Sequence, residues 1–245
     1  MSRLAYKYIP LVSYTKALRL QEALVTRRIE RIKAGGAEMG TDLLLLLQHP
    51  PTYTTGRRFL GKTDPEEKRR LESLGAEFIE TPRGGLTTFH GPGQLVGYPI
   101  LSLPSYKLGV RAYVEKVEQV LIDVCSDFKI KASTSPDTGV WVKEDKVAAM
   151  GIQVRRHVTS HGFALNCNVD LGWYNHIVPC GLVGKGVTSL TKEIMKRDGD
   201  EGAQVIQVDQ ALPKVLSRFG QHFGQKILAV SDVDPSLDAF TEEVL

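Results

Sequence analysis

The sequence lacks the features that mark a membrane protein or a zinc protein. Its longest apolar run is the leucine run 43–47, far shorter than the roughly 20 residues that a membrane-spanning helix needs. Only three cysteines are present, and they form no Cys-x-x-Cys pair, so we expect neither a metal site nor a membrane anchor. An odd cysteine count without a secretory signal favours a reducing compartment.

A strong excess of charge of either sign is also missing. Lysine and arginine total 31 against 28 aspartates and glutamates, a net charge of +3. Nucleic-acid-binding domains usually concentrate more positive charge on one face, so we expect no nucleic-acid partner. The cluster of Arg57, Arg58 and Lys62 fits transient contact with an acidic protein, although solvated surface charge is the simpler interpretation.

No internal repeat or linker divides the chain, and strand and helix patterns alternate without a regular βαβ series. We therefore predict one α+β domain over residues 1–230, a mixed sheet packed with helices, and a peripheral tail at 231–245. The predicted strands are 4–9, 43–48, 78–81, 95–100, 138–142, 146–154 and 158–167. The predicted helices begin after Ser13 and Asp64 and span 110–128 and 208–223, where apolar residues recur at helical spacing.

A glycine-rich segment at 83–93 is the first candidate for chemistry. Neither the Gly-Lys-Ser/Thr of a P-loop nor the helix of a Rossmann turn follows it. Its glycines would let the backbone approach a ligand closely, although sharp turns between two strands are the structural alternative. Arg83 and His90 favour a binding role, because both side chains can hydrogen-bond to a polar group of a ligand.

Lys146 opens the apolar stretch 146–154. A lysine at the edge of a strand is usually exposed, and this is the simpler interpretation of the pattern. In an apolar cleft, by contrast, the loss of solvation would lower the pKa of Lys146 and make the amine a usable base.

Cys180 is the cysteine whose setting favours reactivity. It lies between Pro179 and Gly181, in a predicted turn that would expose the thiol and leave room for a substrate. Cys125 on a predicted helix and Cys167 in a predicted strand are expected to be buried packing residues. A lone cysteine is more often inert, so the case for Cys180 depends on an activating partner. The candidate partners are Lys146, His90, His161 and His176.

Five segments together resemble the octanoyltransferases of lipoic acid synthesis, also called lipoyl(octanoyl) transferases. They are RGGLTTFHGPGQLVGYP at 83–99, TGVWV at 138–142, KVAAMG at 146–151, SHGFALN at 160–166 and VPCGLVGKGVTSL at 178–190. Each segment alone is moderately specific, but the five in this order are highly specific. The resemblance extends from the N-terminal strand to about Glu193.

The resemblance implies the fold of biotin protein ligases and lipoate ligases. It also implies an acyltransferase that needs no cofactor and moves octanoyl from acyl carrier protein to a lysine of a lipoyl domain. The implied acceptors are the lipoyl domains of 2-oxo acid dehydrogenases and the glycine cleavage H protein, so that the reaction is the first step of endogenous protein lipoylation.

Two catalytic roles carry over from the family. The cysteine of its Pro-Cys-Gly motif forms an acyl thioester, and the lysine of its Lys-(x)4-Gly motif lowers the pKa of that cysteine. In this chain these residues are Cys180 and Lys146. The substrate-contacting segments carry over to Arg83, Gly84, Gly85, Leu86, Thr87, Thr88, Phe89, His90, Ala149, Met150, Gly151, Gly162, Phe163 and Ala164.

Other functions remain open on the sequence alone. An ATP-dependent lipoate or biotin ligase would share the fold but would need no nucleophilic cysteine. A silent protein that binds carriers or lipoyl domains would need neither Lys146 nor Cys180. A cysteine protease is a weaker alternative, because its base is more often histidine. The segment 182–186 looks like animal-type members of the family, which favours a mitochondrial location over the cytoplasm of a bacterium.

Overall fold

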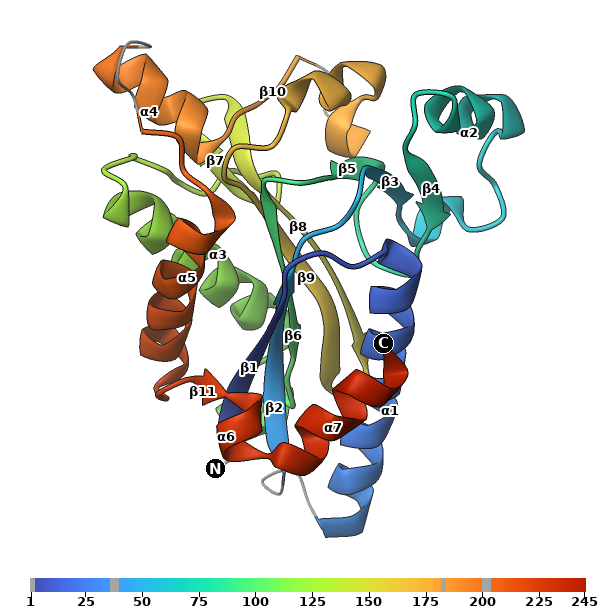
Figure 1. Ribbon diagram of the computed structural model, residues 1–245, viewed down its shortest axis with the longest axis vertical. Coiled ribbons are helices and arrows are strands. Elements are labelled where there is room, and N and C mark those ends of the chain that lie inside the picture. The colour runs from blue at the N-terminus through green and yellow to red at the C-terminus, as the bar shows by residue number, and fades with distance from the viewer. Residues whose placement is uncertain (1–2, 36–39, 182–183, 200–203) are drawn as a thin grey trace.

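A large mixed sheet forms the centre of the chain in a computed structural model that describes residues 3–35, 40–181, 184–199 and 204–245, with only the backbone of Cys180 (Figure 1). The strand order is β10-β8-β9-β6-β2-β1-β11, and β7 pairs with β8 off this path. These strands are β1 (Arg3–Ile9), β2 (Thr41–Leu47), β6 (Gln94–Ile100), β7 (Val140–Val142), β8 (Asp145–Arg155), β9 (Val158–Asn166), β10 (Gly186–Val187) and β11 (Leu228–Ala229). Parallel β1–β2 pairing beside antiparallel β2–β6–β9–β8 pairing makes the sheet mixed.

The leucine run 43–47 lies at the centre of this sheet in β2. Leu44 and Leu46 pack in one core cluster, whereas Leu43, Leu45 and Leu47 pack in another on the opposite face. Successive side chains of a strand point to opposite faces, so an unbroken apolar run requires that both faces be covered. Helices provide that cover.

Helices lie on both faces of the sheet (Figure 1). The face with Leu44 is covered by α3 (Val110–Asp127) and α5 (Val208–Phe223), and the face with Leu43 by α1 (Tyr14–Gly35) and α7 (Pro235–Val244). The shorter α4 (Leu190–Asp198) and α6 (Val230–Val233) follow β10 and β11. Within the described residues, no helix is long and apolar enough to cross a membrane.

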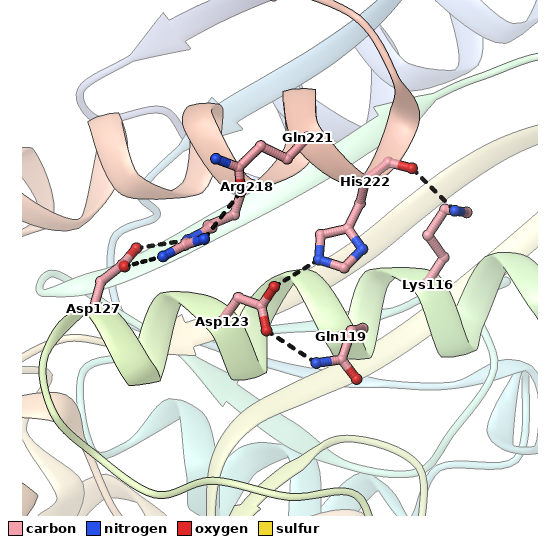
Figure 2. Close-up of polar contacts among 7 residues, drawn as sticks. All are labelled: Lys116, Gln119, Asp123, Asp127, Arg218, Gln221 and His222. Atoms are coloured by element: carbon pink, nitrogen blue, oxygen red, sulfur yellow. Dashed lines mark hydrogen bonds and ion pairs between the residues drawn. The ribbon is translucent and has the colours of Figure 1, made fainter.

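Ion pairs join α3 to α5 along their exposed edge (Figure 2). Arg218 of α5 forms an ion pair with Asp127 of α3. One turn away, the Nε2 atom of His222 lies 2.8 Å from the Oδ2 atom of Asp123, and Lys116 donates to the His222 carbonyl at 3.0 Å. The apolar faces of both helices meet the sheet, and these polar contacts set how the two helices lie against each other.

A smaller sheet lies beside the large one, in the order β4-β3-β5. It consists of β3 (Thr52–Thr55), β4 (Glu77–Glu80) and β5 (Thr88–His90), and is accompanied by the 3₁₀ turn η1 (Arg57–Phe59) and by α2 (Pro65–Glu72). Two further 3₁₀ turns, η3 (Leu171–His176) and η4 (Pro179–Gly181), follow β9, while η2 (Leu103–Tyr106) precedes α3. The small sheet presents the glycine-rich loop 83–87 to the large sheet.

The predicted elements of the large sheet and its helices are confirmed. The β8–β9 hairpin turns between Arg155 and Val158, as expected. Asp64 caps α2 through a 2.9 Å hydrogen bond from the Glu66 amide, and Ser13 accepts from the Lys16 amide at the start of α1. The strands β3 and β5 and the helix α4 were not predicted.

The C-terminal segment 231–245, expected to be peripheral, forms α7 for most of its length. Leu237 is buried in the core cluster under α1. Lys7 of β1 forms ion pairs with Asp238 at 2.5 Å and with Glu242 at 2.6 Å. This helix therefore contributes to one face of the sheet.

Candidate active site

A cavity opens between the β8–β9 hairpin and the loop 83–87. We call it the glycine-lined cavity. Its lining residues are Tyr14, Arg83, Gly85, Leu86, Thr88, His90, Val96, Tyr98, Ala149, Met150, Gly151, His161, Gly162, Phe163 and Ala164. All the predicted substrate-contacting residues line it except Gly84, Thr87 and Phe89. Segments far apart in the sequence thus meet around one space.

Glycine is needed in this wall because backbones approach closely there. A β-carbon on Gly151 would lie 2.7 Å from the Gly84 carbonyl oxygen, and one on Gly162 would lie 2.2 Å from that of Gly97. The Gly84 amide donates to the Ile152 carbonyl at 3.0 Å, which fastens the loop to β8. Any side chain at these glycines would force the loop or the neighbouring strand to move.

Arg83 is buried and holds this loop in place. Its Nη2 atom donates to the Thr54 carbonyl at 2.8 Å and to the Leu86 carbonyl at 3.0 Å, and its Nη1 atom donates to the Gly84 carbonyl at 2.9 Å. Its Nε atom is buried without a partner among the described residues. Most of the donors of Arg83 are therefore used to shape the cavity.

His90 is also buried at the cavity wall. Its Nδ1 atom lies 2.7 Å from the Gln94 Oε1 atom, and its Nε2 atom lies 3.2 Å from the Thr54 hydroxyl. Burial, reinforced by the nearby His49 and Arg83, holds the pKa of His90 well below its ordinary value. His90 is therefore a neutral hydrogen-bonding ring near neutral pH.

Lys146 lies in a second cavity, which we call the Lys146 cavity. Its side chain is only 6% exposed, so the simple expectation of an exposed strand edge is wrong. The ammonium donates to the Thr138 carbonyl at 3.0 Å and lies 4.6 Å from the ring centroid of Trp141. Thr88 and Ala149 line both cavities, so the two spaces adjoin.

The backbone around Cys180 approaches the same place. Pro179 lines the Lys146 cavity, and β10 pairs with β8 at Lys146 itself. The Thr188 amide donates to the Lys146 carbonyl at 3.0 Å. The side chain of Cys180, like residues 182 and 183, lies outside the described residues, and its pairing with Lys146 stays a prediction.

The other two cysteines are buried, as predicted. Cys125 and Cys167 both lie in the core cluster beneath α3 and α5. Burial raises the pKa of each thiol to about 12. Since the thiolate is the nucleophilic form, neither of these cysteines is suited to attack a substrate.

The candidate histidine partners of Cys180 differ in burial and in position. His161 is 2% exposed and lines the glycine-lined cavity, whereas His176 is exposed and its carbonyl accepts from Arg70 at 2.6 Å. Burial, together with the charge of Arg83, lowers the pKa of His161 to about 3. Lys146 is the only candidate partner that lines the cavity beside Pro179, within the described residues.

A buried polar chain that sequence reasoning missed joins the two cavities. Gln94 donates to the Asn166 Oδ1 atom at 2.9 Å and to the Tyr174 hydroxyl at 3.0 Å. Asn166 in turn donates to the Thr188 carbonyl at 2.9 Å. The chain holds the segment after β10 against the end of β9. Its sequence signal was slight, a single polar residue at the start of β6, Gln94, and another at the end of β9, Asn166.

Comparisons with known proteins agree with this geometry. The family model "Lipoyl protein ligase A/B catalytic domain" matches residues 13–220. A mitochondrial octanoyl-acyl-carrier-protein:protein N-octanoyltransferase of Danio rerio is 48% identical over 212 residues, which cover 86% of this chain and 88% of that protein. An octanoyltransferase of Solibacter usitatus is 44% identical, covering 87% of this chain and 88% of that protein.

Among solved structures, the chain resembles a putative lipoate protein ligase of Thermoplasma acidophilum with bound lipoic acid. The TM-score is 0.67, and the alignment covers 99% of this chain and 94% of that one at 13% sequence identity. This likeness confirms the expected ligase-like fold.

Proposed function

The chain belongs to the octanoyltransferases of the lipoyl protein ligase A/B catalytic domain family, and from this premise we propose how its residues carry out acyl transfer. The enzyme is an acyltransferase that transfers octanoyl from an acyl carrier to lipoyl domains. The proposed steps are transfer of octanoyl to Cys180 as a thioester, and then to a lysine of the acceptor domain. The adjoining cavities carry this proposal, because one could hold an acyl chain and the other contains Lys146.

In the first step the Cys180 thiolate attacks the carbonyl carbon of the donor thioester. The bond from carbon to the carrier sulfur breaks, and the carrier leaves as a thiolate that takes the proton from the Lys146 ammonium, which returns Lys146 to the neutral amine. One thioester replaces another, so the step is nearly isoenergetic and needs no ATP. The neutral amine of Lys146 accepts the Cys180 proton beforehand, and the resulting ammonium favours the thiolate.

In the second step the amine of the acceptor lysine attacks the Cys180 thioester. An amide bond forms, the bond from carbon to Cys180 sulfur breaks, and the proton lost by the amine goes to Lys146. A lysine amine is mostly protonated near neutral pH, so a base at this position assists the attack. Backbone amides of the glycine-rich loop would stabilise the oxyanion.

The decisive experiment tests the covalent intermediate. We expect that mixing the protein with octanoyl-carrier, without acceptor, adds one octanoyl mass to the peptide that contains Cys180, and that hydroxylamine removes it. Cys180→Ala should abolish both the adduct and the transfer of octanoyl to a lipoyl domain. Cys167→Ala serves as the control, since its thiol is buried and should be dispensable for the adduct.

Turnover of Cys180→Ala within a few-fold of the wild-type rate would refute covalent catalysis. The same assay separates the alternative functions. A ligase would require ATP and a free acid, whereas transfer from the carrier thioester should proceed without ATP. A silent binding protein would form no octanoyl adduct and would produce no octanoylated lipoyl domain.

We propose as acceptors the lipoyl domains of 2-oxo acid dehydrogenases and the glycine cleavage H protein, and acyl carrier protein as the donor. A mitochondrial location is supported by the Danio rerio relative, which is named as mitochondrial. The octanoyltransferase of Solibacter usitatus, a bacterial protein, is 44% identical over most of this chain, so a bacterial cytoplasm stays the alternative location.

A further inference from the structure

His161 departs from the alternation of its strand. In β9, Phe163 and Leu165 pack in the core cluster beneath α3 and α5, whereas Ala164 packs on the opposite face. His161 lies two residues before Phe163, so the alternation of a strand would place both side chains on the same face. The His161 ring instead contacts Tyr98 of the opposite face, with ring centroids 6.1 Å apart and ring planes at 82°. A positive φ of 53° at His161 explains the reversal.

This conformation is unfavourable for a residue with a β-carbon. Surroundings must therefore hold it, and Gln21 of α1 does so by accepting from the His161 amide at 2.7 Å. Strained conformations of this kind persist where the placement of a side chain has a use. At His161 the strain directs an imidazole ring into the glycine-lined cavity.

Among the β8 and β9 residues that line this cavity, His161 lies furthest along the strands from the Lys146 cavity. In the register of β8 and β9, Ala149 pairs with Ala164 beside the Lys146 cavity, and Ile152 pairs with His161. The three residue steps from Ala149 to Ile152 span about 10 Å at about 3.4 Å per residue. An octanoyl group has seven carbon–carbon bonds of about 1.5 Å, or roughly 9 Å when extended as a zigzag.

Beyond His161 lies a different space, which we call the polar cavity. Its wall includes Gln21, Gln153 and Ser160, and His161 lines both this cavity and the glycine-lined cavity. The Nδ1 atom of His161 and the Nε2 atom of Gln21 are buried without a hydrogen-bond partner among the described residues. His161 thus divides a mainly apolar space from a polar one.

We propose that His161 is the end wall of the acyl-binding cavity and sets the longest acyl chain that the enzyme accepts. This inference rests on the proposed acyl transfer and adds a specificity-determining residue to it. A chain of eight carbons ends at the imidazole, and a longer chain must displace the ring into the polar cavity.

The test is the acyl-chain preference of His161→Gly. Glycine adopts a positive φ without strain, so the backbone should be retained while the wall opens. We would measure acylation of Cys180 by small thiol esters of octanoate, decanoate and dodecanoate. Each methylene newly buried should raise the rate by about fourfold, so the decanoyl-to-octanoyl ratio, which reflects two methylenes, should rise by about sixteenfold over wild type.

Two further variants sharpen the result. Ser160→Ala changes only the polar cavity and should keep the wild-type chain preference. His161→Asn provides a second test should the glycine variant fail to fold, because asparagine tolerates this backbone conformation and is shorter than histidine. It should shift the preference in the same direction by a smaller factor.

An unchanged chain preference in a folded His161→Gly or His161→Asn protein would overturn the role of His161, while octanoyl loading of wild type would leave the proposed function intact. Failure of the wild-type protein to take up any acyl group would instead overturn both.

Discussion

At the scale of single residues, the burial of Lys146 is the observation on which its proposed role rests. Lys146 is 6% exposed, faces the ring of Trp141 and donates to the Thr138 carbonyl. The Glu118 carboxylate, which accepts from the Gly139 amide, interacts with Lys146 electrostatically. An ammonium next to a cysteine stabilises the thiolate and so lowers the pKa of the thiol.

Lys146→Met should therefore raise the pH at which Cys180 is alkylated. We expect a shift of roughly one to three pH units, the effect typical of a nearby charge. The measurement is the rate of iodoacetamide labelling of the Cys180 peptide across pH 5 to 10. Lys131→Met, at an exposed position after α3, is the matched control, and an unchanged labelling profile for Lys146→Met would refute the activating role.

At the scale of elements, the α3–α5 pair should respond to acid (Figure 2). The hydrogen bonds and charge of Arg218 hold the pKa of Asp127 below its ordinary value. A carboxyl group whose pKa is depressed by folding stabilises the fold above its unfolded pKa, and this contribution is lost as the pH falls through the folded pKa. The stabilisation by Asp127 is thus present at pH 7 and declines below about pH 4.

Asp127→Asn should lower the free energy of unfolding at pH 7 by about 0.2–1 kcal/mol, the usual value of a surface ion pair. The difference from wild type should shrink below about pH 4. Urea denaturation at pH 7 and at pH 3.5 would measure it. Glu115→Gln removes the highly exposed pair with Arg111 and should have a smaller effect at pH 7; a pH-independent difference for Asp127→Asn would contradict the linkage.

The same scale shows which elements could be predicted from the sequence. Long elements such as α5 and β8 carry enough residues to show a helical or strand period. The strands β3 and β5 have four and three residues, too few to show one, and they were therefore missed, although β4 of the same small sheet was predicted. In α4 the buried Leu190 and Ile194 are outnumbered by polar residues, so the apolar stripe was obscured.

The active site was predictable to the extent that its residues lie in distinctive segments. Gly85, Arg83, His90 and the residues at 149–151 line one cavity, and their contact with substrate stays a prediction. Tyr14 also lines the cavity, but in the sequence it belongs to the apolar stripe of a helix, which indicated only packing against the core. The His161 side chain reaches the cavity because its backbone is in the left-handed conformation. Strand alternation alone would place this side chain on the other face of the sheet.

At the scale of the whole molecule, the small net charge of +3 conceals a local concentration of positive charge. Arg57, Arg58 and Lys62 are exposed and form no ion pair within the part of the chain described. Phe59 and Leu60 among them are 39% and 41% exposed. A surface of unpaired cations around exposed apolar side chains is suited to a partner that presents carboxylates.

This surface, residues 57–62, adjoins residues that line the glycine-lined cavity. The Arg57 amide donates to the Arg83 carbonyl at 2.9 Å, and a β-carbon on Gly56 would lie 2.0 Å from the Gly85 carbonyl oxygen. Both Arg83 and Gly85 line the cavity. A carrier bound at 57–62 would therefore be positioned to deliver its acyl group directly.

Reversing the charge of this surface should weaken the encounter with the carrier and leave the chemistry intact. We expect Arg57→Glu combined with Arg58→Glu to raise KM for octanoyl-carrier several-fold at low salt, with kcat nearly unchanged, because complementary charge acts mainly on association. The effect should diminish at high ionic strength. A small octanoyl thioester should react at the wild-type rate, since it has no acidic surface.

Lys131→Glu with Lys226→Glu makes the same change in net charge at exposed positions elsewhere. An equal rise in KM for that control would assign the effect to overall charge, and no rise for the Arg57 and Arg58 variant would exclude this surface as the docking site.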